Sequence, residues 1–171
     1  MDSYVLLAQK AIKAYIKNKT ILQAPRDLAS EFHKRRAGVF VTIYNKKNLR
    51  GCIGTFLPTK ENIALEIIDN AISACSRDYR FMPITENELP NLSYEVGILS
   101  EPRPVKDLKK HNPKIHGIII STSDGRRGLL LPDLETIDTT EQQIIIASQK
   151  GGINPRIDKI QLDEFTAEKH R

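Results

Sequence analysis

The residues best suited to chemistry lie in one short stretch of the sequence, from Leu49 to Phe56. It contains the cation Arg50, the thiol Cys52 and two glycines, Gly51 and Gly54. A guanidinium beside a cysteine favours the thiolate, which is the nucleophilic form. Two glycines inside a strand mark a bend or the close approach of a ligand or another backbone. The stretch is therefore a candidate for a reactive or ligand-contacting thiol, with room for a small molecule above Gly54.

Cys52 also has a plain structural interpretation. Cysteine is among the most buried residue types and often packs as a small hydrophobe, and taken by itself the stretch favours that interpretation. The run from Gly51 to Gly54 also matches the GXXG loop of RNA-binding KH domains, but that loop joins helices. Here strand-forming residues flank the run, so we interpret the match as accidental.

Three residues elsewhere could complete a site. Asp78 and Arg80 follow a predicted helix, where they form either a surface ion pair of little energetic value or an arginine grip on a ligand carboxylate or phosphate. His116 is the histidine best placed to act as a base toward Cys52, although a histidine that merely satisfies a strand edge is the commoner case. Asp78 and Arg80 join Arg50, Gly51 and Gly54 as candidate ligand contacts, whereas Cys52 and His116 are the candidate catalytic residues.

The sequence predicts neither a metal site nor a cofactor. His111 and His116 are five residues apart and flank Pro113, so they do not repeat on one helical face. Neither cysteine belongs to a CxxC pair. No predicted strand is followed by a GxGxxG turn or a phosphate loop, so the usual nucleotide fingerprints are absent.

Hydrophobic periodicity predicts the elements that position these residues in the first half. Residues 3–18 form an amphipathic helix with Ser3 as its N-cap, and a short helix lies within 27–36. Strands over 38–44 and 49–56 form a hairpin. Thr59 then caps a helix that ends before Pro83.

The second half is mainly strands. Apolar and polar residues alternate over 92–98, as in a strand with one buried face, and the turn Asp124-Gly125 joins two further strands. Thr140 and Gln143 form a capping box that opens a helix, and a final strand includes Ile160 and Leu162. This order predicts an α+β fold with a mainly antiparallel sheet, and residues 1–171 as a single domain.

Composition limits the classes of function. Hydrophobic residues make up 40% and charged residues 27% of the 171 residues, as in ordinary globular proteins. No stretch approaches the roughly 20 apolar residues of a membrane-spanning helix, and the start shows no secretory signal, so we expect a cytoplasmic protein without membrane contact. The net charge of +5 allows nucleic-acid binding, but aromatics are few and no nucleic-acid module is legible, so this function ranks last.

The residues Leu49-Arg50-Gly51-Cys52-Ile53-Gly54-Thr55 resemble the signature of the AMMECR domain family. The resemblance spans nearly the whole chain, since further matches follow in order. They are Gly38–Thr42, Ala74, Asp78, Arg80, Phe81, Pro83, Glu95-Val96, Leu99-Ser100, His116-Gly117, Arg127-Gly128 and Leu130–Pro132.

The resemblance implies two unequal lobes with a cleft between them, lined partly by the signature. In prokaryotes such domains are often encoded with, or fused to, Memo-like and radical SAM proteins, which implies partners of those kinds. We therefore expect an accessory or adaptor protein whose cleft binds a small molecule or a partner segment. The alternatives are an enzyme that uses Cys52 as nucleophile or redox-sensitive thiol, and an RNA- or nucleotide-binding module.

Overall fold

The computed structural model describes residues 2–171, which divide into two compact units. The first unit runs to Leu99 and includes Glu168–Arg171, and the second unit is Ser100–Ala167. Among the described residues, no helix is long and apolar enough to cross a membrane.

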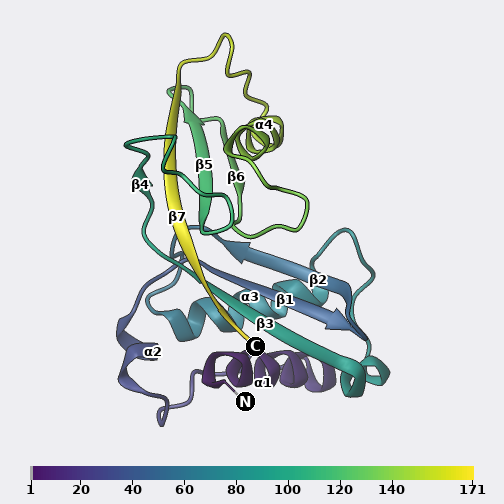
Figure 1. The fold of residues 1–171 in the computed structure, drawn as a ribbon. Helices are drawn as coiled ribbons and strands as arrows, with labels where there is room; N and C mark the ends of the chain where they lie inside the picture. Colours follow the sequence, from purple (N-terminus) through teal and green to yellow (C-terminus); the bar gives the residue numbers. More distant parts are fainter. Residues whose placement is uncertain (1) are drawn as a thin grey trace. The chain divides into compact units, whose positions relative to one another are not determined.

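The first unit contains an antiparallel sheet with β1 (Val39–Asn45) between β2 (Asn48–Thr55) and β3 (Leu92–Leu99). Alternate residues of β1 point to one face, and Val39, Val41 and Ile43 are fully buried there. Two helices pack on this face, α1 (Ser3–Asn18) on β3 and α3 (Ile63–Ser76) on β1 and β2 (Figure 1). The sheet's other face therefore carries the alternate residues of the signature strand.

The caps of these helices differ from the expected ones. Asp2, not Ser3, caps α1, because its carboxylate accepts hydrogen bonds from two backbone N–H groups. Asn62, not Thr59, caps α3. Thr59 instead donates its backbone N–H and its hydroxyl to the buried carboxylate of Glu66. The shorter helices of this unit are α2 (Ser30–Lys34) and the 3-10 helix η1 (Glu86–Asn91).

The second unit is built around the antiparallel strands β5 (His116–Thr122), β6 (Arg127–Leu130) and β7 (Ile160–His170), with β7 continuing into the first unit. The two-residue strand β4 (Arg103–Pro104) pairs with β7. Helix α4 (Thr140–Lys150) packs on β5 and β6. Its capping box lies one residue earlier than expected, on Thr139 and Gln142, which leaves Gln143 in the interior.

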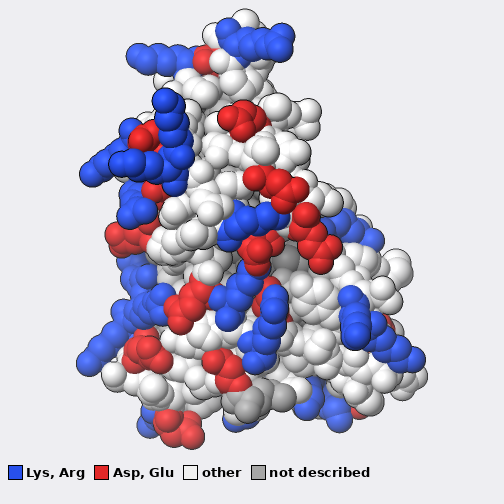
Figure 2. Space-filling view, in the orientation of Figure 1, with Lys and Arg blue, Asp and Glu red and all other residues white. Residues whose placement is uncertain are grey.

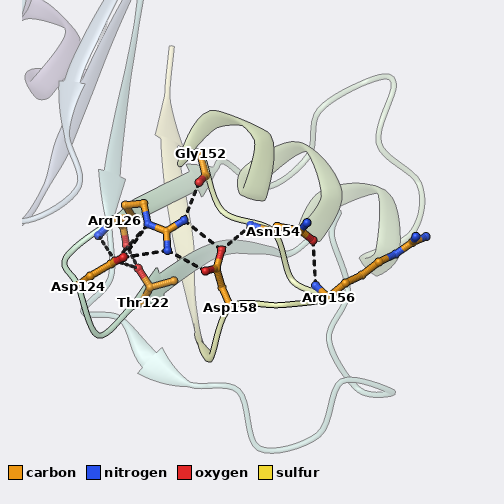
Figure 3. A network of polar contacts seen from close by, with 7 residues as sticks. All are labelled: Thr122, Asp124, Arg126, Gly152, Asn154, Arg156 and Asp158. Carbon is orange, nitrogen blue, oxygen red and sulfur yellow. Dashed lines mark hydrogen bonds and ion pairs between the residues drawn. The ribbon is translucent and has the colours of Figure 1, made fainter.

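Arg126 connects the β5–β6 hairpin to the segment after α4 (Figure 3). Its guanidinium donates to Asp124 in the hairpin turn, to the Gly152 carbonyl, and to Asp158 at 2.8 and 3.0 Å. Asp158 in turn accepts the backbone N–H of Asn154 at 2.7 Å. Arg126 thus joins three segments of the second unit.

The predicted α+β fold with a mainly antiparallel sheet is confirmed. Every strand pair described is antiparallel, as the order of the predicted elements indicated. The long helices and the hairpins fall where the periodicity placed them, with ends displaced by a few residues.

Candidate functional site

The signature strand β2 carries a bulge at Arg50. Leu49 pairs with Tyr44 and Gly51 pairs with Ile43, so Arg50 is the extra residue on its strand. Gly51 faces α3, whereas Cys52 lies on the opposite face, where its Sγ is 3.2 Å from the Thr42 hydroxyl.

Cys52 is half-buried, and its backbone is held on both sides. Its N–H donates to Asp78 Oδ2 at 2.9 Å, and its carbonyl accepts from Arg80 Nη2 at 3.1 Å. The thiol shares a hydrogen bond with the Thr42 hydroxyl, and among the described residues of the first unit no imidazole hydrogen-bonds to it. The structure thus fixes the position of Cys52 through residues 26 and 28 positions away.

Asp78 and Arg80 form an ion pair, one of the two predicted alternatives. Arg80 Nε and Nη2 donate to the two carboxylate oxygens of Asp78 at 2.9 and 2.7 Å. These hydrogen bonds outweigh the opposing effect of burial and lower the pKa of Asp78 to about 2. The Asp78 side chain is 2% exposed but that of Arg80 is 43% exposed, so the guanidinium still reaches solvent.

Arg50 is held by Glu88, a residue that our sequence analysis missed. Its Nε and Nη2 donate to the Glu88 carboxylate at 2.7 and 3.0 Å, and its Nη1 donates to the Met82 carbonyl at 2.9 Å. The hydrogen bond from Arg50 lowers the pKa of Glu88 to about 2. The spacing of Thr85 and Glu88 is that of a capping box, and it was the one sequence signal that could have indicated Glu88 as a fixed residue.

The two glycines accommodate neighbouring protein atoms. A Cβ on Gly51 would lie 2.2 Å from the Ala74 carbonyl oxygen, because α3 approaches the strand there. A Cβ on Gly54 would lie 2.3 Å from the ring of Phe40. The expectation that Gly54 leaves room for a small molecule is therefore wrong, since the Phe40 ring occupies that space.

The loop between Asp78 and Pro83 presents large apolar side chains beside the signature strand. Tyr79 is 93% and Met82 is 82% exposed. The Phe81 ring lies near both arginines, with its centroid 6.0 Å from Arg50 Cζ and 5.5 Å from Arg80 Cζ. We call Tyr79, Phe81 and Met82 the 79–82 surface.

His116, the candidate base, belongs to the second unit and lies at the start of β5. There the structure brings it together with His111, whose ring centroid is 5.5 Å away, and with Glu164 of β7. His111 hydrogen-bonds to Glu164 at 3.0 Å and to Gln143 at 2.6 Å. The two histidines do not share a helical face, but a turn at Asn112–Ile115 brings them together instead.

A single family model covers both the signature strand and His116. The model described as AMMECR1 matches residues 5–170. The chain belongs to the AMMECR1 family. The resemblance stated from the signature is confirmed.

Other AMMECR1-family chains are similar over most of this one. A protein of Thermotoga maritima is 44% identical over 98% of this chain and 97% of its own length. A protein of Clostridium acetobutylicum is 36% identical over 99% of this chain, which corresponds to only 36% of that longer protein. The crystal structure of an uncharacterized protein from Pyrococcus horikoshii has a TM-score of 0.85 at 31% identity, covering 97% of this chain and 88% of the other.

Proposed function

We propose that this AMMECR1-family protein is an accessory protein whose signature strand and 79–82 surface bind a segment of a partner protein. One observation carries the proposal. Two large apolar side chains, Tyr79 and Met82, are almost fully exposed on a loop that is tied at both ends to the signature strand. Aromatic residues and methionine are enriched in protein interfaces, where exposed apolar anchors dominate the binding energy.

The anchoring of the loop supports binding without large rearrangement. Asp78 holds the Cys52 N–H, and Arg50 holds the Met82 carbonyl. Because both arginines already pair with carboxylates, their charges are largely neutralised within the protein. The partly exposed guanidinium of Arg80 still leaves a place for one acidic group. The favoured partner segment therefore combines apolar side chains with a carboxylate.

Memo-like and radical SAM proteins are the proposed classes of partner. The length of the Clostridium acetobutylicum relative, of which this chain covers 36%, supports a domain that works beside other domains. The two-lobed arrangement and the cleft expected from the family resemblance remain part of this proposal.

The test is binding of a Memo-like and a radical SAM protein from the same genome, measured by calorimetry. The double variant Tyr79→Ala, Met82→Ala should weaken binding at least about tenfold, as loss of interface anchors does. Ile157→Ala is the matched control, since Ile157 is 81% exposed but lies in the second unit. The proposal is wrong if neither protein binds, or if the double variant binds as tightly as the control.

An enzymatic role for Cys52 is the second candidate. The half-buried thiol, with its backbone fixed by Asp78 and Arg80, favours it. Nucleophilic catalysis needs a base within hydrogen-bond reach, and the partner of Sγ is the Thr42 hydroxyl. This arrangement supports a contact thiol better than an activated one.

Nucleic-acid binding stays last. Lysine and arginine side chains are interspersed with aspartate and glutamate on the face shown in Figure 2. A backbone-tracking site requires a continuous basic stripe, so this face gives the third function little support.

A further inference from the structure

Two histidines and a glutamate form a cluster in the second unit, separate from the signature strand. His111, His116 and Glu164 each offer one ligand atom, and these atoms lie within 4.8 Å of one another. The His111 side chain is fully buried and that of Glu164 is 13% exposed. We propose that this cluster binds a divalent transition-metal ion of the zinc type. The proposal does not depend on the function proposed above.

Gln143 determines which nitrogen of His111 carries a hydrogen. Gln143 Nε2 donates to the His116 carbonyl at 2.9 Å, so its Oε1 is the atom 2.6 Å from His111 Nε2. Since Oε1 only accepts, His111 Nε2 must be the donor. In the neutral ring, Nδ1 then has a lone pair. This lone pair lies 3.0 Å from Glu164 Oε2, which is also an acceptor.

Two facing acceptors require a positive charge between them, which either a proton or a metal ion can supply. A proton would make His111 an imidazolium paired with Glu164, but it would leave His116 unused. Among the described residues, Nδ1 of His116 is buried and has no hydrogen-bond partner. Such an orphaned buried group is costly. A metal ion bound by all three side chains accounts for the whole cluster.

The donor set is that of a zinc site with an open position, because two imidazoles and one carboxylate leave a fourth ligand free. The hydrogen bond from His111 to Gln143 is the outer contact that ligating histidines usually make. Arg103 Nε holds the other oxygen of Glu164 at 3.0 Å. In a tetrahedral zinc site, bonds of about 2.1 Å place the ligand atoms about 3.4 Å apart. The ligand atoms of the cluster lie within 4.8 Å of one another, so the most distant pair would move together by up to about 1.4 Å.

A cavity of about 470 Å³ opens beside the cluster, and His116 and Glu164 form part of its wall. The rest of the wall is mainly charged: Arg103, Lys106, Asp107 and Lys110, with Pro104. The cations oppose a bare dication and favour an anion as the fourth ligand. The site therefore fits a metal ion that holds a water molecule or a small anionic compound.

The test uses untagged protein, stripped with a chelator and titrated with Zn²⁺ by calorimetry, with bound metal counted by mass spectrometry. Wild type should bind one ion per chain. His116→Ala and Glu164→Gln should each weaken binding at least about tenfold, because losing even an outer-shell partner costs 10–100-fold. His33→Ala is the control for adventitious histidine binding, since His33 is exposed and lies in the first unit.

The metal-free His116→Ala variant should stay folded, because the buried Nδ1 of His116 makes no hydrogen bond that the variant would lose. It therefore decides the question even if Glu164→Gln fails to fold. Absence of stoichiometric Zn²⁺ binding, or equal affinity in wild type and His116→Ala, would overturn the proposal. Partner binding through the 79–82 surface is measured separately, so the two proposals can fail independently.

Discussion

At the scale of single residues, carboxylates determine what the signature's charged groups can do. Asp78 and Glu88 take up the guanidinium groups of Arg80 and Arg50 and lock them against the protein. Arg50 therefore hydrogen-bonds to Glu88 rather than to the thiol of Cys52. The two ion pairs are a structural frame for the strand, and the frame should be sensitive to acid.

We expect the free energy of unfolding to fall in acid as the carboxylates of Asp78 and Glu88 are protonated. The pKa values of Asp78 and Glu88 lie at about 2, below the ordinary 3.8 and 4.5. Carboxyls with a depressed folded pKa contribute stability above their unfolded pKa and lose it as pH falls through the folded pKa. The loss should run from about pH 4.5 to about pH 2, on the order of 2 kcal/mol per carboxyl before allowing for solvent exposure.

Urea unfolding at a series of pH values measures this loss. Glu88→Gln should flatten the pH dependence, whereas Glu86→Gln should not, because Glu86 is 62% exposed. A pH dependence unchanged by Glu88→Gln would show that Glu88 has no such role.

The two cysteines should differ in reactivity toward iodoacetamide. Cys75 is 2% exposed, and burial raises its pKa to about 11, so little thiolate forms at neutral pH. Cys52 is half-buried. Peptide mass spectrometry of the native protein should find Cys52 labelled first and Cys75 only after denaturant is added.

A Cys52→Ser variant serves as the control and should take up no label while folded. If both cysteines resist alkylation until denaturation, Cys52 is packed, and the enzymatic alternative should be abandoned.

At the scale of elements, α3 packs so closely on the signature strand that only glycine fits at position 51. The Ala74 carbonyl oxygen would lie 2.2 Å from a side chain at Gly51, and helix backbone cannot yield as a side chain can. Thr55, the last signature residue, donates its hydroxyl to the buried Glu66 of α3 at 2.6 Å. Strand and helix thus form one packed pair.

Gly51→Ala should therefore destabilise the protein by about 1–3 kcal/mol, the usual cost of overpacking. Gly97→Ala is the matched control, because Gly97 lies in β3 of the same sheet and a Cβ there has no atom within 4 Å. Denaturant unfolding measures both. Equal stabilities of the two variants would contradict the close approach of α3.

At the scale of the whole molecule, the net charge is +5. On the face shown in Figure 2, the positive side chains are interspersed with negative ones. Many of the cations pair with carboxylates, such as Arg35 with Glu168 and Arg171 with Glu95. Long-range attraction to a polyanion is then weak and easily screened, since the Debye length is about 8 Å at physiological ionic strength.

Binding to RNA or DNA should accordingly be weak and strongly dependent on salt. Retention on immobilised RNA should fall steeply as salt rises and be lost near physiological ionic strength. A globular protein of equal net charge serves as the control for retention by charge alone. Tight binding that persists at physiological salt would instead raise nucleic-acid binding to the leading function.

The sequence by itself determined the elements and the family. Helices and strands followed from local periodicity, as in α1 and β3, because burial of one face repeats every 3.6 or 2 residues. The signature of residues 49–55 was sufficient to indicate the family that the match over 5–170 confirms. The sequence did not determine the helix caps, which are Asp2 and Asn62 rather than the expected Ser3 and Thr59. Several neighbouring polar side chains compete there for the same backbone N–H groups.

Only the tertiary structure decided which polar groups meet. Glu88 is 38 residues from Arg50, and Glu164 is 53 residues from His111. The periodicity of a strand shows which face a side chain takes, but the partner on that face comes from another element, and its register depends on packing of the whole unit. For the same reason the ring of Phe40 occupies the space above Gly54, because the pairing of β1 with β2 places these two residues opposite each other.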